Sequence, residues 1–214
     1  FFNHKLPIQH FRLLDCSESK LDAENIKKIS AILRNNLLSH KLLFNTLKLY
    51  SRTWTTNMIT NAEMLIHSPH ISQIELRNAD TAIIVAPGPS LLKNIHELKR
   101  IKGEALIVSV LNAVPTLLKE GIMPDVVVHV DSTPNRDLVE KLKRRLHTEI
   151  PLFIVAAHLP QVTLEIPTKQ FVWTEMSSSV NDDLSRHLGL STPPAYGPCV
   201  SIVALNLCAI WKIE

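Results

Sequence analysis

The segment Ala86–Leu91 (APGPSL) joins a short apolar run to a helical pattern, and its residues suit the binding of an anion. Gly88 permits a backbone angle or a close ligand approach that a side chain would block, and Ser90 can cap the following helix. The free N–H groups and the dipole at a helix start favour a phosphate. The spacing matches neither GxGxxG nor GxxxxGK[ST]. Gly88, Pro89 and Ser90 are therefore candidate nucleotide-binding residues, and a capped turn without a ligand is the alternative.

Polar residues also follow the next apolar runs, where parallel strands would end. Asn112 offers a donor and an acceptor that could read a base or a ribose. Asp131 could accept from ribose hydroxyls or bind a metal, and its alternative role is to cap the next helix. Ligands of open α/β sheets bind at the carboxyl ends of strands, so we expect a nucleotide site there. Further candidates in this region are Ser132 and Asn135, together with His158, although a lone histidine is more often structural.

A second helix start could complete the site. The segment Gly197–Ser201 (GPCVS) opens the last helical pattern and could hold another phosphate or carboxylate. Gly197, Cys199 and Ser201 are therefore added to the nucleotide-binding candidates, with a capped, buried helix as the alternative. Cys199 could be nucleophilic at such a position, but the sequence shows no paired base. It also has no CxxC, HExxH or GxSxG spacing, so we predict no metal site apart from Asp131 under one alternative below.

The elements that would position these residues alternate between strand and helix patterns from residue 77 onward. Alternation in steps of ~25 residues implies parallel strands joined by right-handed crossovers. We therefore predict an α/β fold for residues 77–214: a Rossmann-like open, mostly parallel sheet with flanking helices. A strand should follow the last helix, so we expect the C-terminal part of the domain to be missing. The expected strands are 81–86, 105–110, 125–130, 152–157 and 170–174, and the expected helices are 90–101, 113–120 (ending at Gly121), 136–147, 181–187 and 200–210.

Residues 1–76 are predicted to form a separate, all-helical N-terminal region. Residues 20–68 contain neither Gly nor Pro, and their apolar residues recur at helical spacing. We expect three helices, around 26–37, 42–50 and 58–66, and interpret their apolar stripes as core packing.

Composition limits the partners and the compartment. The net charge is +3 with signs intermixed, which lacks the dense basic patch of a nucleic-acid-binding protein. The sequence has no run of ~18 apolar residues, so we expect no membrane span. Three sparse cysteines argue against a disulfide framework and favour a reducing cytoplasm.

Three motifs together resemble the motility-associated factor (Maf) family of flagellin glycosyltransferases. They are the GPSL turn Gly88–Leu91, the segment Gly121–Asp131 and the late helix Gly197–Leu207. The central domain of that family shares a superfamily with the archaeal 6-hydroxymethylpterin pyrophosphokinase MptE. The resemblance covers about residues 50–214 and includes Asn57 and Asn61 in the helical stretch before the first strand.

The turn is also similar to that of bacterial sialyltransferases, in which a GNGPSLK turn and an Asn after the second strand hold a CMP-sugar. Residues 88–91 match the turn and Asn112 matches the Asn, whereas Pro87 replaces an Asn of the motif. The catalytic histidine of those enzymes lies beyond the late helix, so the resemblance assigns no catalytic residue here.

The resemblance implies a glycosyltransferase whose donor is a CMP-activated nonulosonic (sialic-like) acid and whose acceptor is a protein Ser/Thr, with flagellin as the partner. No tightly bound cofactor is expected. One alternative is a 6-hydroxymethylpterin diphosphokinase, in which Asp131 would be a Mg²⁺ ligand. Another is a non-catalytic nucleotide-binding or flagellar interaction module.

Overall fold

The computed structural model describes residues 23–76, 80–174, 189 and 199–213 of the chain. Contacts divide the chain into two compact units, Phe1–Arg52 and Thr53–Glu214. The predicted helix at 181–187 lies outside the described residues.

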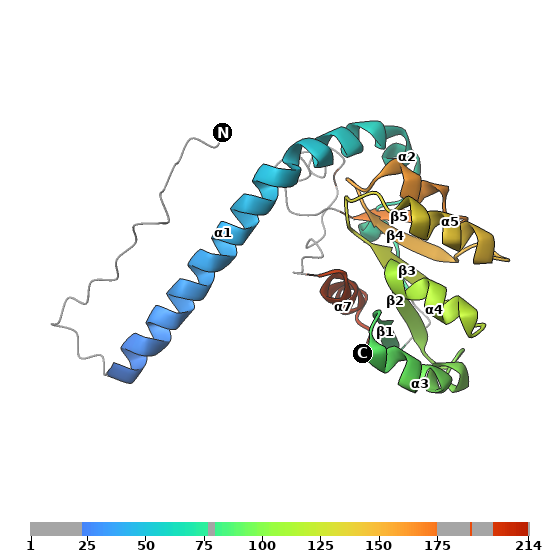
Figure 1. The fold of residues 1–214 in the computed structure, drawn as a ribbon, viewed down its shortest axis with the longest axis horizontal. Coiled ribbons are helices and arrows are strands. Elements are labelled where there is room, and N and C mark those ends of the chain that lie inside the picture. Colours follow the sequence, from blue (N-terminus) through green and yellow to red (C-terminus); the bar gives the residue numbers. More distant parts are fainter. Residues whose placement is uncertain (1–22, 77–79, 175–188, 190–198, 214) are drawn as a thin grey trace. The chain divides into compact units, whose positions relative to one another are not determined.

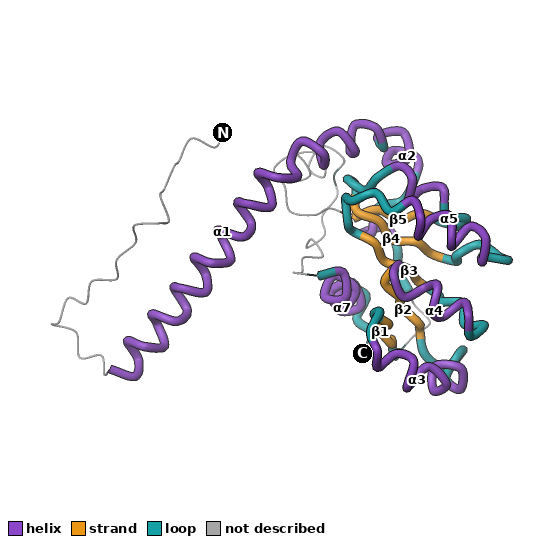
Figure 2. The backbone as a smooth tube through the Cα atoms, viewed as in Figure 1, coloured by secondary structure: helices purple, strands orange, loops and turns teal. Residues whose placement is uncertain are grey.

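Helix α1 (Ala23–Thr60) is one helix of 38 residues, drawn as a continuous coil in Figure 2. The expected breaks at residues 38–41 and 51–57 are therefore wrong, because no Gly or Pro interrupts the helix there. The third expected helix, 58–66, spans the end of α1 and α2 (Ala62–His67). The expectation of core packing is also wrong for much of unit Phe1–Arg52. Its exposed large apolar residues are Ile29, Ile32, Leu33, Leu38, Leu42, Phe44, Leu49 and Tyr50.

Five parallel strands form the sheet of unit Thr53–Glu214, in the order β1-β2-β3-β4-β5 (Figure 1). This confirms the predicted α/β fold and its parallel pairing. The apolar, β-branched runs form the central strands because both faces of a parallel sheet are covered. We call the edge at which the strands end the carboxyl edge, and the opposite edge the amino edge. The strands are Ala82–Val85, Leu106–Val110, Val126–His129, Leu152–Ala156 and Phe171–Thr174.

Helices cover the sheet on both faces (Figure 1). Helices α3 (Pro89–Arg100), α4 (Val114–Lys119) and α5 (Arg136–Arg145) connect successive strands and lie on one face, whereas α7 (Val200–Ile210) packs on the other against β1, β2 and β3. Side chains alternate accordingly. Val127 joins the core beneath α4 and α5, while its neighbours in β3 join the core beneath α7. Short 3-10 turns at Ile71–Gln73, Leu111–Ala113 and Gln161–Glu165 complete the described elements with α2 (Ala62–His67).

The compact unit begins well before the first strand. Met58 and Leu65, from the end of α1 and from α2, belong to the same core cluster as Phe153 and Trp173. The backbone N–H of Trp173 in the edge strand β5 donates to the carbonyl of Pro69 at 3.1 Å. The predicted boundary between residues 76 and 77 therefore falls inside this unit, because the preceding helical segment buries its apolar face on the sheet.

Candidate functional site

Three loops carry candidate residues, and the strand register places the starts of these loops side by side at the carboxyl edge. We call the row of paired strand residues from which the loops are counted one level. Val85 lies opposite Ser109, which in turn lies opposite Val127. Gly88 and Asn112 each come three residues after this level (85 to 88 and 109 to 112), and Asp131 comes four residues after it (127 to 131). Neighbouring strands are ~5 Å apart, so these loops form one continuous surface.

The turn after β1 opens helix α3 without a side-chain cap. Gly88 is the N-cap residue and Ser90 lies inside the first turn, so the expected capping role of Ser90 is wrong. Gly88 has φ −175°, an extended angle that any residue adopts. A Cβ at this position would meet only Ser90 Oγ, at 3.9 Å. The backbone at Gly88 therefore does not require glycine, although glycine is one of the residues that N-cap positions favour. The helix start keeps its dipole, which favours an anion. Pro89 has no N–H and the Leu91 N–H donates to the Gly88 carbonyl at 3.1 Å, so the Ser90 N–H is the donor that this first turn offers a ligand.

Helix α3 also borders a hollow of about 440 Å³ along β1. Ser90 and Asn94 line it together with the apolar Leu91 and Leu98. Its volume lies within the range of small-molecule sites, roughly 300–1,000 Å³. The anion-favouring helix start is thus next to a concave, partly apolar surface.

The polar residues that follow β2 and β3 differ in their exposure and in the hydrogen bonds that they form inside the protein. Asn112 is exposed between the buried Leu111 and Ala113, so its amide projects from the carboxyl edge. Asp131 is exposed, and its Oδ1 accepts from the Thr133 N–H at 2.9 Å.

The expected capping role of Asp131 is wrong, because another residue caps α5. The Oδ1 atom of Asn135 accepts from the Leu138 N–H at 3.0 Å, three residues into the helix. Ser132 is buried, and its Oγ accepts from Trp54 Nε1 at 2.8 Å. Ser132 and Asn135 thus hold structure in place, and the exposed Asp131 carboxylate holds the following turn through one of its two oxygens.

Sequence reasoning did not find Trp54 and His129. The Trp54 ring stacks on the His158 ring, with centroids 4.7 Å apart and planes 28° apart. His158 and His129 are buried, and burial lowers the pKa of each to about 4, an effect that the nearby Asp131 charge partly offsets. Both rings are therefore neutral at neutral pH. Trp54 stacks on His158, so this histidine ring is packed inside the protein.

Two asparagines attach the end of α1 to the loop after β4. Asn57 Nδ2 donates to the His158 carbonyl at 2.9 Å. The buried Asn61 Nδ2 donates to the carbonyls of Ala157 and Leu159, at 3.3 and 2.8 Å. These bonds satisfy carbonyls that no further strand pairs with, and they hold the loop against the helix. No local sequence signal pairs residues about 100 positions apart.

The start of α7 reaches the same carboxyl edge. Val200 packs against the core clusters on both sides of the sheet, one of which contains Val85 and Val110. Cys199 is the exposed N-cap residue and forms no side-chain cap bond, and Ser201 is half-buried in the first turn. Gly197 lies outside the described residues. The structure therefore places Cys199 and Ser201 beside the ends of β1 and β2.

The described part of the chain does not gather potential metal ligands in one place. Within residues 23–76, 80–174, 189 and 199–213, no three His, Cys, Asp or Glu side chains gather at a metal-binding distance. A Mg²⁺ ion beside Asp131 would therefore take most of its ligands from substrate phosphates and water. In the same part of the chain, no helix is both long and apolar enough to cross a membrane.

Comparison with known proteins supports this fold and family. No curated protein matches the chain. One solved structure, the MAf glycosyltransferase from Magnetospirillum magneticum AMB-1, is similar with a TM-score of 0.56 at 18% identity. The match covers 69% of this chain and 23% of that one, so the chain spans about a quarter of the length of the solved protein. The family model described as "6-hydroxymethylpterin diphosphokinase MptE-like" matches residues 56–213, and the chain therefore belongs to the MptE-like family.

Proposed function

We propose that the unit Thr53–Glu214 binds a CMP-activated nonulosonic acid and takes part in its transfer to a protein Ser/Thr hydroxyl, with flagellin as the acceptor. One observation carries the proposal. An uncapped helix start, an exposed amide and an exposed carboxylate follow three adjacent parallel strands at one level. The shared fold of a solved MAf glycosyltransferase supports it.

Each group has a role that suits its chemistry. In the transfer, the acceptor hydroxyl gives its proton to a base and its oxygen bonds to the anomeric carbon. The bond from that carbon to the phosphate oxygen breaks, and CMP leaves with the electron pair. The Ser90 N–H and the dipole at the start of α3 would stabilise the charge that develops on the phosphate. Asn112 would read the cytosine or the ribose, and Asp131 would accept from ribose hydroxyls. The start of α7, at Cys199 and Ser201, would supply further N–H groups.

Calorimetric titration of the chain with CMP tests the proposal. Ser90→Ala and Asn112→Ala should each weaken binding by about tenfold. The first removes the Ser90 hydroxyl, a further phosphate donor in the first turn of α3, the second removes the Asn112 amide, and such a hydrogen bond is worth ~1.4 kcal/mol. Gln170→Ala is the matched control, since this exposed amide precedes β5 at the amino edge. Equal CMP affinity in all three variants, or no CMP binding at all, would overturn the proposal.

The family name favours one second function, diphosphate transfer from ATP to a hydroxymethyl pterin. That reaction needs positioning and Mg²⁺, with Asp131 as the ligand on the protein. Binding of Mg·ATP that is lost in Asp131→Asn, in a chain that does not bind CMP, supports this function. A chain that binds CMP but transfers no sugar in the presence of acceptor protein would be a non-catalytic nucleotide-binding module.

A further inference from the structure

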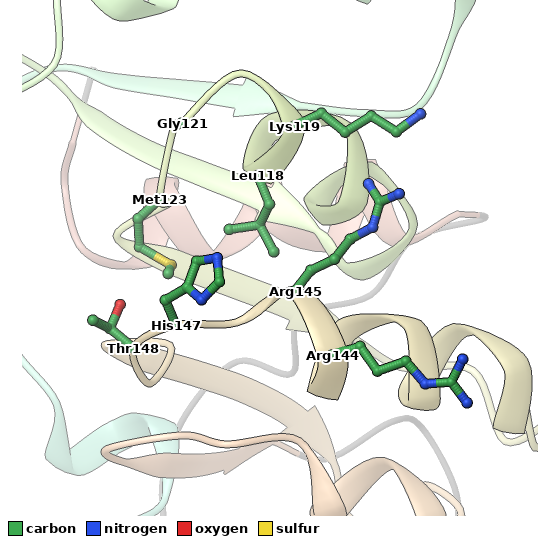
Figure 3. Close-up of a pocket in the computed structure, with 8 residues that line it drawn as sticks. All are labelled: Leu118, Lys119, Gly121, Met123, Arg144, Arg145, His147 and Thr148. Carbon is green, nitrogen blue, oxygen red and sulfur yellow. The ribbon is translucent and has the colours of Figure 1, made fainter.

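A second hollow lies at the amino edge, away from the candidate site. Its volume is about 370 Å³, and its lining comes from the end of α4, the turn at Gly121–Met123 and the end of α5 with the following residues His147–Thr148 (Figure 3). These segments lead into the amino ends of β3 and β4, whereas the candidate site follows the carboxyl ends. The two sites are therefore on opposite edges of the sheet.

Three side chains around this hollow are cationic. Lys119, Arg144 and Arg145 line it together with His147, and no carboxylate of the described residues does. Nearby lysines are neutralised: Lys99 pairs with Glu120 at 3.1 Å, and Lys143 pairs with two glutamates at 3.0 and 3.3 Å. Among the described residues, Lys119, Arg144 and Arg145 form no such pair. The positive charge around the hollow is therefore uncompensated.

The hollow also has an apolar floor. The half-buried Leu118 and Met123 line it beneath the cationic groups. Figure 3 shows the Lys119 and Arg145 side chains extending from α4 and α5 toward the same side, while Arg144 points away along α5. Arg145 also reaches back to α4, where its Nη1 donates to the Pro115 carbonyl at 3.5 Å. The half-buried Arg145 guanidinium and the exposed Lys119 thus line the hollow together with two apolar side chains.

The interaction of basic side chains with the helix dipoles does not explain this arrangement. Basic residues in a last helical turn gain about 0.3–1 kcal/mol from the dipole, and they gain it equally on a convex surface. That effect explains the charge but neither the concavity nor the apolar floor. A ligand with an anionic group and a compact apolar body explains all three, and the volume lies within the small-molecule range of roughly 300–1,000 Å³.

We propose that this hollow binds a phosphate group carried by a small molecule, with Arg145 and Lys119 as the residues that contact the phosphate. A guanidinium presents two parallel N–H donors to phosphate oxygens, and a lysine ammonium adds a point charge. The apolar floor takes the body of the ligand. This site is independent of the nucleotide site, so either can fail without the other.

Titration of the chain with inorganic phosphate and pyrophosphate tests the proposal, with binding followed by calorimetry and by amide NMR shifts at Gly121 and Thr148. Arg145→Gln and Lys119→Gln should each weaken pyrophosphate binding by about tenfold, the loss of one charge-assisted hydrogen bond. Lys141→Gln is the matched control, because it removes the same charge from an exposed position of α5 outside the hollow. Ser90→Ala should leave these shifts unchanged, which separates this site from the start of α3.

Vesicles distinguish the sources of the phosphate. Co-sedimentation with phosphatidylcholine vesicles that contain phosphatidic acid, lost in Arg145→Gln, identifies a lipid headgroup as the source. Pyrophosphate binding without co-sedimentation identifies a soluble ligand. The proposal is overturned if the two hollow variants bind pyrophosphate as the Lys141→Gln control does. It is also overturned if a poly-glutamate peptide binds while neither phosphate nor vesicles do.

Discussion

At the scale of single residues, similar polar side chains at the carboxyl edge have different tasks. Asn135 caps α5, Ser132 accepts from the Trp54 indole, and Asp131 Oδ1 accepts from the Thr133 N–H. Hydrogen bonds that are already made inside the protein leave less capacity for a ligand. Ligand contacts are therefore expected from the exposed Asn112 amide, and from Asp131 through its second carboxylate oxygen, more than from Ser132 and Asn135.

The buried histidines predict a pH dependence at this scale. His129 and His158 have a folded-state pKa of about 4, below the ordinary 6.5, so the unfolded chain binds more protons between these values. Stability should be fully present above pH 6.5 and fall toward pH 4, with a slope approaching ~1.4 kcal/mol per pH unit for each histidine. Urea unfolding between pH 6.5 and 5 measures this slope. His158→Asn should reduce the slope, and the exposed His67→Gln should not; an equal slope in all three proteins would contradict the assignment.

At the scale of elements, the ends of α3 and α4 show two uses of glycine. Gly121 has φ +70° and terminates α4, with its N–H bonded to the Leu118 carbonyl and the Ile122 N–H bonded to the Leu117 carbonyl. This is the Schellman geometry, which favours glycine at that position. It confirms the predicted helix end. Gly88, in contrast, has an extended backbone at the start of α3.

Alanine substitutions at these two positions should therefore have different effects, one on stability and the other on ligand binding. Gly121→Ala should lower the unfolding free energy by about 1 kcal/mol, the cost of a Cβ in the left-handed region. Gly88→Ala should change stability by less than about 0.5 kcal/mol, because its angles suit any residue, but it should weaken CMP binding. Chemical denaturation and calorimetry measure the two effects. Comparable destabilisation by both substitutions would refute this assignment.

At the scale of the whole molecule, the helical segment at residues 53–76 belongs to the α/β unit. Met58 and Leu65 are buried in its core, and the buried Asn61 amide serves two carbonyls of the loop after β4. Removing this segment would expose apolar surface and leave buried carbonyls unpaired, which costs about 1–3 kcal/mol for each polar group.

Truncation tests this division of the chain. Residues 53–214 alone should unfold cooperatively, with a melting temperature within about 5 °C of the whole chain, since a shift of that size corresponds to only ~2 kcal/mol for a domain of this length. Residues 77–214 should melt much lower or fail to fold. Circular dichroism on heating measures both. Identical melting of the two fragments would instead favour the sequence-based boundary between residues 76 and 77.

The local pattern by itself determined the elements of the α/β unit. Apolar, β-branched runs predicted all five strands to within one residue at each end, and Gly121 marked the end of α4. Both signals are local, because a buried strand is a continuous run of such residues and a left-handed helix end is favoured by glycine at one position. The same pattern failed for α1. Helical spacing of apolar residues predicts a face, but it does not say what covers that face.

Only the tertiary structure decided which polar residues form hydrogen bonds or ring contacts inside the protein. Asp131 and Asn135 were both possible caps for α5, and Asn135 is the cap, since its position three residues before Leu138 suits the bond. Trp54 and His158 are about 100 positions apart and become neighbours only when α1 packs on the sheet. Strand order likewise sets which loops share the carboxyl edge. Such contacts depend on how elements pack in three dimensions, and sequence spacing carries no record of that packing.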